Sequence, residues 1–299
     1  MRDAAFPSPL PSQSSILNPQ SFLVCGRFRL ALDRPLIMGV VNVTPDSFSD
    51  GGRFLDAGAA IDHARRLAEE GADILDVGAE SSRPGAGAVV TAEEELRRLL
   101  PVLKGLRDLP APVSVDTVRP EVMRAAVGEG AAMINDINAL RAPGALEAVA
   151  AADVGVCLMH MQGEPRTMQS APHYGDVVAE VKAFLADRVA AAEARGIARE
   201  RIAIDPGFGF GKTVAHNFEL LRNLGRIAEL ELPVIAGWSR KSTLGAVTGR
   251  PVSDRLAASL AAALLAVQRG ARIVRVHDVA ATRDAFAVLA ALEAVPKRN

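Results

Sequence analysis

The chain has few cysteines, no excess of charge of either sign and no long apolar run. Its two cysteines, Cys25 and Cys157, fit neither a disulfide framework nor the ligand spacing of a metal site, and this usage is typical of a reducing cytoplasm. The formal net charge of −1 disfavours a nucleic-acid-binding surface. The longest apolar stretch, around residues 256–267, is too short for a transmembrane helix and contains Ser259. The composition therefore predicts a cytoplasmic protein with neither a nucleic acid nor a membrane as partner.

Residues 1–20 differ in composition from the rest of the chain. They contain Pro7, Pro9, Pro11 and several serines, and they have neither the apolar core nor the basic leader of a secretory signal. We predict that they form a disordered tail. No similar Pro- and Ser-rich linker interrupts the remaining sequence, so we predict one domain over residues 21–299.

From residue 36 onward the chain repeats one unit, a short apolar run followed by a loop and an Ala-rich amphipathic segment. The runs are rich in β-branched residues and do not alternate with polar ones, which is typical of parallel strands buried on both faces. We predict strands over residues 36–43, 74–77, 113–115, 131–134, 154–159, 202–204, 234–236 and 273–276. Helices are predicted over residues 57–70, 92–104, 120–128, 143–151, 175–195, 217–226, 254–270 and 280–294.

Eight strand–helix units in roughly 260 residues predict an α/β protein with a single closed (β/α)8 TIM barrel. A doubly wound open sheet is the alternative, but its Gly-x-Gly-x-x-Gly fingerprint does not follow any predicted strand. Local signals support the helices. Thr91 and Glu94 have the spacing of a capping box, and glycines stand where helix C-termini are expected, at Gly71, Gly128, Gly196 and Gly270.

Polar residues stand at or just after the end of almost every predicted strand, and in a barrel these positions converge on one mouth. A single one could be a satisfied core polar group or a cap for the next helix, and we expect one of these structural roles for Asp136. Buried carboxylates and amides cost free energy unless they are paired or bind something, so this many around one rim predict a binding site. The residues are Asn42, Glu80–Arg83, Asp116, Asn135, Asp136, His160, Asp205, Ser239–Lys241, Arg275 and His277.

These rim residues divide into two chemical zones. Asp116, Asn135 and Asp205 offer hydrogen-bond acceptors that suit a flat heterocycle with adjacent N–H and NH2 groups. The second zone is cationic and suits a phosphate or pyrophosphate. It consists of Arg83, Lys241, Arg275 and His277. A mouth with both zones predicts a ligand in which a heterocycle is joined to an anionic group.

Other catalytic motifs fail on spacing. The segment 207–213 resembles a nucleotide phosphate loop, but Pro206 stands where the first glycine of that motif is required and lacks the N–H of a phosphate cradle. We therefore expect a sharp turn near a ligand rather than an ATP site. The chain has no Gly-x-Ser-x-Gly elbow and no His-Glu-x-x-His, and His160 and His277 are too isolated for a zinc site.

Several segments, taken together and in order, closely resemble the dihydropteroate synthases, from near Leu36 to about Ala294. Two of them would be the family's first loops, Asn-Val-Thr-Pro-Asp-Ser-Phe-Ser-Asp at 42–50 and Glu-Ser-Ser-Arg-Pro-Gly at 80–85. The others resemble later strand ends, at 114–117, 134–137, 158–161, 205–212, 239–242 and 275–278. The resemblance implies a TIM-barrel enzyme that joins 4-aminobenzoate to a dihydropterin pyrophosphate and releases pyrophosphate.

The resemblance also implies residue roles. The pterin would be bound by Asp116, Asn135, Met159, Asp205, Lys241 and Arg275, with Arg275 stacking on the ring. Asn42 would ligate Mg2+, and the pyrophosphate would be held by Asn42, Arg83, Arg275 and His277. The 4-aminobenzoate subsite would comprise Phe48, Ser82, Arg83, Pro84, Phe210, Lys241 and Ser242. Catalysis would depend on Arg83, Lys241, Arg275 and His277, in a protein that forms a homodimer.

One position departs from the family pattern, because Ser82 stands where a threonine is usual; the hydroxyl is kept and a methyl group is lost. This change bears on the shape of the aminobenzoate pocket and on the sulfonamide response. Two alternatives share the pterin pocket. A pterin-dependent methyltransferase would not need the two loops or the cationic residues, and a non-catalytic pterin-binding homologue would have lost some of them. Both features are present here.

Overall fold

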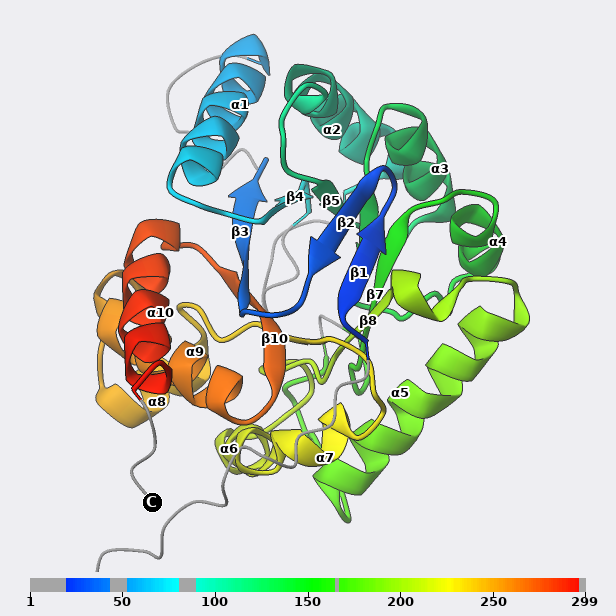
Figure 1. Cartoon of the computed structure of the whole chain (residues 1–299). Coiled ribbons are helices and arrows are strands. Elements are labelled where there is room, and N and C mark those ends of the chain that lie inside the picture. The colour runs from blue at the N-terminus through cyan, green and yellow to red at the C-terminus, as the bar shows by residue number, and fades with distance from the viewer. Residues whose placement is uncertain (1–19, 44–52, 81–89, 165–166, 296–299) are drawn as a thin grey trace, which may run out of the picture.

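Eight parallel strands close into a barrel, in the order β10-β3-β4-β5-β6-β7-β8-β9, and helices surround it (Figure 1). The computed structural model describes residues 20–43, 53–80, 90–164 and 167–295. The predicted (β/α)8 barrel is confirmed, and the open sheet was the wrong alternative. The predicted tail lies almost wholly outside the described residues, so it stays a prediction.

The barrel strands follow the predicted apolar runs, with ends displaced by no more than two residues. They are β3 (Leu36–Asn42), β4 (Ile74–Gly78), β5 (Val113–Asp116), β6 (Met133–Asp136), β7 (Gly155–Met159), β8 (Ile202–Asp205), β9 (Val234–Ala236) and β10 (Ala271–Val276). Their side chains alternate between the barrel interior and the surrounding helices. In β4, for example, Leu75 and Val77 pack in the large core between barrel and helices, whereas Ile74 packs with residues inside the barrel.

The helices bury their apolar faces against the outside of the barrel. Those expected from the sequence are α1 (Arg53–Glu69), α2 (Ala92–Leu106), α3 (Pro120–Gly128), α4 (Ala145–Ala150), α5 (Val177–Ala194), α9 (Leu256–Gln268) and α10 (Val279–Glu293). The helix predicted over 217–226 is two helices, α6 (Val214–Arg222) and α7 (Leu224–Ala228), and the short α8 (Ser242–Thr248) was not predicted. No helix within the described ranges is long and apolar enough to cross a membrane.

Two of the helix-end predictions need correction. Thr91 accepts a hydrogen bond from Glu94 N at 3.2 Å, but the Glu94 carboxylate binds Arg97 and Arg98, so only half of the capping box forms. A reciprocal box instead joins Thr213 to His216 at the start of α6. Gly71, Gly196 and Gly270 have the positive φ expected of C-terminal glycines, whereas Gly130, not Gly128, has it after α3.

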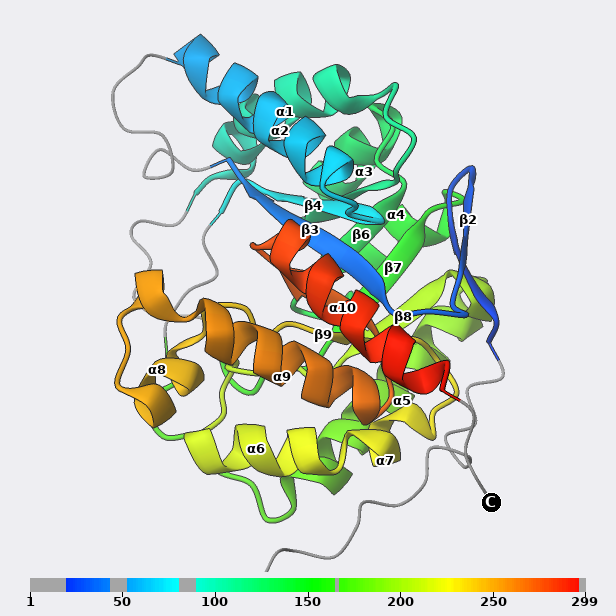
Figure 2. The same cartoon turned by 60° about the vertical axis from the view of Figure 1, so that its left-hand side comes forward.

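An antiparallel hairpin, β1 (Phe22–Cys25) and β2 (Phe28–Ala31), covers the end of the barrel where the strands begin. Leu23 and Cys25 are fully buried and pack with Met38, Ile74 and Met133 of the barrel interior. The hairpin crosses the centre of the ring in Figure 1, and Figure 2 shows it at the opposite end from α8. The sequence did not predict this element. It closes one end of the barrel and leaves the carboxyl ends of the strands for a site.

The hairpin comes very close to β7 at Gly155. A methyl group at this position would lie 2.8 Å from the Cys25 sulfur and 3.0 Å from the Val24 carbonyl oxygen. Glycine is therefore required for the hairpin to seat. Cys25 and Cys157 are both buried free thiols.

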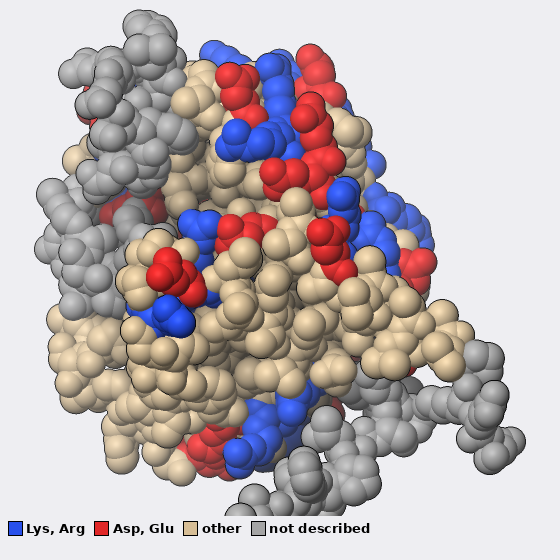
Figure 3. Space-filling model, turned by 90° about the vertical axis from the view of Figure 1, so that its left-hand side faces the viewer, with Lys and Arg blue, Asp and Glu red and all other residues tan. Residues whose placement is uncertain are grey.

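The outer surface over α9 and α10 exposes apolar side chains. Leu256 and Leu265 lie on α9, and Val288 and Leu292 lie one turn apart on α10; we call these four residues the α9–α10 face. Val288 is 73% exposed and Leu292 is 63% exposed. Figure 3 faces this side of the molecule and shows a broad area with few charges, bordered above and below by charged groups. Exposed apolar side chains on a surface with few charges are typical of contact regions.

Candidate active site

The interior of the barrel changes from apolar to polar along its axis. Near the hairpin it holds Leu36, Met38, Met133, Ala203 and Ile273, all buried. Two residues further along the strands, on the same side because strand side chains alternate, the interior residues are polar. They are Asp76, Ser114, Asp116, Asn135, Asp205 and Arg275, with Met159 beside them on β7. The predicted gathering of strand-end residues at one mouth is confirmed for Asp116, Asn135, Met159, Asp205 and Arg275.

Arg275 is held between two carboxylates. Its Nε donates to Asp76 Oδ2 at 2.6 Å, and its Nη2 donates to Asp116 Oδ2 at 3.0 Å. Asn135 Nδ2 donates to the same Asp76 oxygen at 3.1 Å. Asp76 therefore links β4 to β6 and β10 inside the barrel. Its Oδ1 has no hydrogen-bond partner although it is buried, and neither has Ser114 Oγ, its register partner on β5.

Asp76 was missed by the sequence reasoning, which considered only polar residues at strand ends. Asp76 lies in the middle of β4 and is fully buried. A lone carboxylate within a buried apolar run was the available signal, because such a group requires a charged partner. The predicted separation into an acidic and a cationic zone also needs correction. Arg275 is bonded to two carboxylates, so both kinds of charge meet at one place.

Asp205 and Lys241 form the other side of the mouth. Asp205 Oδ1 accepts a hydrogen bond from Gly207 N at 2.6 Å, which fixes the carboxylate at the end of β8. Lys241 reaches in from the loop after β9, and its Nζ donates to the Phe208 carbonyl oxygen. The same Nζ lies 4.9 Å from the centroid of the Phe210 ring, within the range of a cation–π contact. The predicted neighbours Phe210 and Lys241 are thus brought together.

Burial shifts the ionisation of this cluster towards neutral pH. It raises the pKa of Asp116 to about 7, against the opposing effect of Arg275. Burial likewise raises the pKa of Asp205, although Lys241 opposes this. Burial lowers the pKa of Lys241 to about 8, while the Asp205 charge acts in the opposite direction. Shifts of this kind, in several groups that share one mouth, are typical of a functional site.

The turn after β8 is built around a buried lysine. Lys212 Nζ donates to the carbonyl oxygens of Gly207 at 2.9 Å and Phe210 at 3.0 Å, and it lies 2.9 Å from His160 Nδ1. Burial and the Lys212 charge together lower the pKa of His160 to about 2, so the imidazole is neutral and accepts. Because Lys212 is engaged with its own turn, the segment does not have the free lysine of a phosphate loop, and the interpretation against an ATP site is supported.

Gly207 shows why this turn needs glycine. Its φ is +68°, and a Cβ there would lie within bonding distance of the His160 carbonyl oxygen, at 1.8 Å. His160, expected at the rim, points away from the barrel interior. Its ring packs edge-on against Phe184 of α5, with centroids 4.9 Å apart. His160 is therefore a supporting residue for the turn and not a wall of the mouth.

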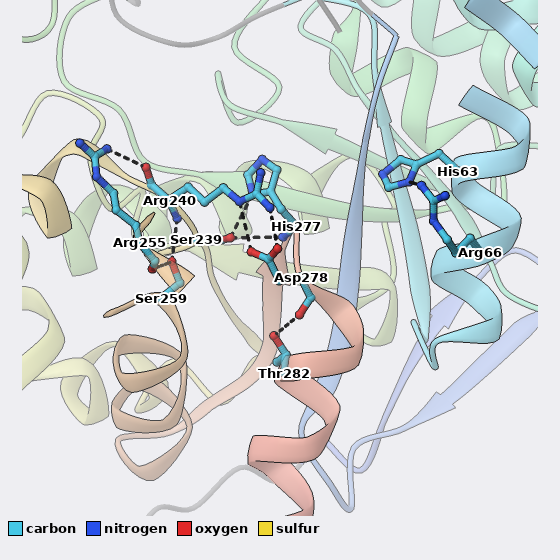
Figure 4. A network of polar contacts seen from close by, with 9 residues as sticks. All are labelled: His63, Arg66, Ser239, Arg240, Arg255, Ser259, His277, Asp278 and Thr282. Carbon is cyan, nitrogen blue, oxygen red and sulfur yellow. Dashed lines mark hydrogen bonds and ion pairs between the residues drawn. The ribbon is translucent and has the colours of Figure 1, made fainter. Parts of the chain in front are cut away.

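Four further predicted residues lie around the rim. His277 follows β10, and both its backbone N and its Nδ1 contact Ser239 Oγ, at 3.2 and 3.0 Å (Figure 4). Asn42 ends β3 and is half-buried, and Ser242 begins α8 directly after Lys241. Asp136 is buried and accepts from the backbone N of Asn138 and Leu140 at 2.7 and 2.8 Å, so it is a satisfied core polar group in a turn. It does not cap the next helix, α4, whose N-cap is Gly144.

The predicted residues Phe48, Ser82, Arg83 and Pro84 lie outside the described residues. The residues on either side of 81–89 are tied together by Arg119 of the loop after β5. Arg119 Nη1 bonds Glu80 at 2.6 Å and the buried Glu95 at 2.5 Å, and its Nη2 donates to the Val90 carbonyl oxygen at 2.6 Å. Sequence reasoning missed this cluster because Glu95 and Arg119 fall on a helix and a loop, where single charges are usually solvated.

Comparisons with known proteins agree with this geometry. A family model described as pterin binding enzyme matches residues 38–277. The dihydropteroate synthase of Escherichia coli K12 is 49% identical over 263 residues, which is 88% of this chain and 93% of the relative. That of Neisseria meningitidis serogroup B is 52% identical over 274 residues, covering 89% of this chain and 96% of the relative.

Solved structures that resemble this chain are also dihydropteroate synthases. The dihydropteroate synthase of Xanthomonas albilineans with 4-aminobenzoic acid has a TM-score of 0.87 and 58% identity, covering 93% of this chain and 100% of that chain. The same enzyme in complex with 7,8-dihydropteroate has a TM-score of 0.84 and 56% identity, covering 92% and 100%. The chain therefore belongs to the pterin-binding enzymes, a family of barrels. Within that family it belongs with the dihydropteroate synthases, which are transferases.

Proposed function

We propose that the chain condenses 6-hydroxymethyl-7,8-dihydropterin pyrophosphate with 4-aminobenzoate to give 7,8-dihydropteroate and pyrophosphate, in folate synthesis. The observation that carries this proposal is the cluster of Asp116, Asn135, Asp205, Lys241 and Arg275 at one open end of the barrel. It combines acceptors for an aminopyrimidinone with cations for a departing anion. The proposal is supported by relatives that carry this activity in their names.

Asp116, Asn135 and Asp205 would bind the polar edge of the pterin, with Met159 against the ring. Asp76 lies beneath them and accepts from both Asn135 and Arg275, so it would hold these two side chains in position. A site organised before the ligand binds does not spend binding energy on reorganisation. Arg275, whose charge is stabilised by two carboxylates, would stack on the ring and face the pyrophosphate.

In the proposed reaction, the C–O bond to pyrophosphate breaks early. The leaving group takes the bonding pair, and the pterin methylene carbon becomes a cation delocalised over the ring. The nearby carboxylates of Asp116, Asp205 and Asp76 would stabilise that cation, while Arg275, His277, Lys241 and Arg83 would stabilise the departing charge. The uncharged amine of 4-aminobenzoate then attacks the methylene carbon and releases its proton. No strong general base is required.

Mg2+ is proposed as the cofactor. Asn42, half-buried at the end of β3, would supply an amide oxygen, and the substrate's phosphates and water would complete the oxygen ligands that this ion prefers. Mg2+ would supply a Lewis acid for the leaving group. Within the described ranges no group of three or more His, Cys, Asp or Glu could hold a metal by itself.

The 4-aminobenzoate subsite is proposed to include Phe210, Lys241 and Ser242. These residues are supported by proximity: Lys241 lies over the Phe210 ring and is followed directly by Ser242. Phe48, Ser82, Arg83 and Pro84 are proposed from the sequence pattern alone. A cytoplasmic location fits the two free thiols, and a homodimer fits the α9–α10 face.

A pyrophosphate-release assay tests the proposed function. Purified protein is mixed with the pterin pyrophosphate and Mg2+, with and without 4-aminobenzoate, and dihydropteroate is identified by mass spectrometry. We expect dihydropteroate and pyrophosphate in equal amounts only in the complete mixture, and a loss of turnover when EDTA removes Mg2+. Binding of the pterin without any product would instead support a non-catalytic homologue, the alternative left by the sequence.

A further inference from the structure

The loop after β9 sends three successive side chains to three different places. Ser239 contacts the backbone and ring of His277 (Figure 4). Lys241 reaches into the barrel mouth, where its Nζ donates to the Phe208 carbonyl oxygen. Between them, Arg240 points away from the mouth and forms a bidentate pair with Asp278, at 3.1 and 2.5 Å. Asp278 directly follows His277 and precedes α10. Each member of this pair is therefore next in sequence to a residue of the candidate site, Arg240 to Lys241 and Asp278 to His277.

Arg240 has a left-handed backbone, with φ of +60°, which is unfavourable for a residue with a Cβ. Such strain persists only where the surroundings fix it. Arg240 N donates to the buried Ser259 Oγ at 3.0 Å, and its carbonyl oxygen accepts from Arg255 Nη1 at 3.1 Å. The backbone of Arg240 is thus held by Ser259 of α9 and by Arg255, the residue that precedes α9.

The Arg240–Asp278 pair is partly solvated, with side chains 40% and 25% exposed. Exposed ion pairs contribute little to folding stability, even in good geometry. The pair joins the loop after β9 to the loop after β10, so its main effect is to fix the position of one loop relative to the other. Within those loops, Lys241 and His277 each belong to the candidate site, and both depend on the direction of the strained turn.

We propose that Arg240 is a positioning residue for the reaction. By pairing with Asp278 and keeping the turn in its left-handed form, it directs Lys241 into the barrel mouth and Ser239 towards His277. This inference rests on the proposed function, since it concerns the same mouth. The side chain of Arg240 is 40% exposed and bonds Asp278. Its loss would therefore change the alignment of Lys241 and His277 without removing either side chain.

A matched pair at the other end of the barrel provides the control. Arg34 binds Asp73 with the same bidentate geometry, at 3.0 and 2.5 Å, and its side chain is 61% exposed. Arg34→Ala removes an equivalent ion pair far from the mouth. Arg240→Gly removes the pair but suits the positive φ, so the variant retains the turn's preferred backbone. Arg240→Ala, Asp278→Ala and their double variant complete the set.

The experiment measures kcat and KM for both substrates by pyrophosphate release, with thermal unfolding of every variant. A misplacement of about 1 Å in a catalytic group can cost about 100-fold in rate, so we expect kcat of Arg240→Ala to fall by about 10- to 100-fold. Arg240→Gly loses the pair but keeps a backbone suited to the positive φ, so its kcat should fall by less. Arg34→Ala should keep the wild-type kcat. The Arg240→Ala/Asp278→Ala double variant should be no slower than the slower single variant, because both remove one interaction.

The outcomes separate the two proposals. A wild-type protein that forms no dihydropteroate would refute the proposed function. An active wild type, together with Arg240→Gly and Arg240→Ala variants that are folded and within twofold of its kcat, would refute the positioning role alone. Additive losses in the double variant would also contradict the inference. Rescue of kcat by Arg240→Lys, which keeps one charged contact to Asp278, would support it.

Discussion

Arg275 lies between Asp76 and Asp116, and this arrangement fixes both the place and the charge of its guanidinium. The pKa of Arg275 is raised by the two carboxylates, against the effect of burial, so the group stays charged throughout the working pH range. Under the proposed function a fixed cation of this kind stabilises the pyrophosphate as its charge develops. Because the guanidinium is already paired with two carboxylates, it should also bind other anions from solution only weakly.

Replacement of Arg275 by alanine should therefore act on the transition state. We expect kcat/KM for the pterin pyrophosphate to fall by about 100- to 1,000-fold, a loss of about 2.7–4 kcal/mol of transition-state stabilisation, as for the loss of one preorganised donor. Arg275→Lys keeps the charge but loses the second contact and should be intermediate. A near-wild-type rate for Arg275→Ala, with folding confirmed by thermal unfolding, would remove the residue from the mechanism.

Asp205 has a different task, as an acceptor on the pterin side of the mouth. Asp205→Asn replaces one carboxylate oxygen with an NH2 donor, which leaves a mismatch against an N–H or NH2 of the ring. We expect the Kd for the pterin pyrophosphate to rise by about 10-fold or more, equivalent to about 1.4 kcal/mol. Calorimetry measures this directly, and an unchanged Kd would contradict the assignment.

The pKa shifts predict a narrow pH optimum. Asp116 must be ionised to accept from the ring, and its pKa is raised to about 7, so kcat/KM should rise as the pH increases through about 7. Lys241 must be charged, and its pKa is lowered to about 8, so kcat/KM should fall as the pH passes about 8. A flat profile between pH 6 and 9 would show that these ionisations do not govern the step.

The strands and most helices could be predicted from the sequence, because buried parallel strands read as unbroken apolar runs and the helices carry caps and glycine stops. The hairpin was missed because β1 and β2 are four residues each and precede the first repeat. The short α8 has only seven residues, too few for a repeated apolar spacing to stand out in the sequence. Asp76 was missed because its role depends on which strands are neighbours. A single sequence indicates the neighbours only after the barrel fold has been inferred.

The hairpin also yields a prediction at Gly155. Gly155→Ala would press a methyl group against Cys25 and Val24, so we expect destabilisation by about 1–3 kcal/mol. Gly58→Ala is the control, since a Cβ at that helical position meets nothing within 4 Å and should stabilise by up to about 1 kcal/mol. Urea unfolding measures both. Equal midpoints for Gly155→Ala and the wild type would show that the hairpin moves freely aside.

For the whole molecule, the α9–α10 face predicts self-association. Val288→Glu with Leu292→Glu places two charges on this surface, so we expect a dimer to become a monomer in sedimentation velocity. Val214→Glu alters an exposed valine on α6, outside the face, and should leave the mass unchanged. A wild-type protein that is monomeric at micromolar concentration would contradict the proposed homodimer.

The fold gives the described barrel one entrance, because Leu23 and Cys25 of the hairpin seal its base. Under the proposed function, both substrates would therefore arrive, and both products would depart, through this one opening. The pterin would bind the deeper polar layer and would have to enter before 4-aminobenzoate occupies an outer position nearer the opening. A compound bound in the outer position would consequently block release of a pterin bound below it. The apparent affinity of such a compound should therefore increase once a pterin occupies the inner layer.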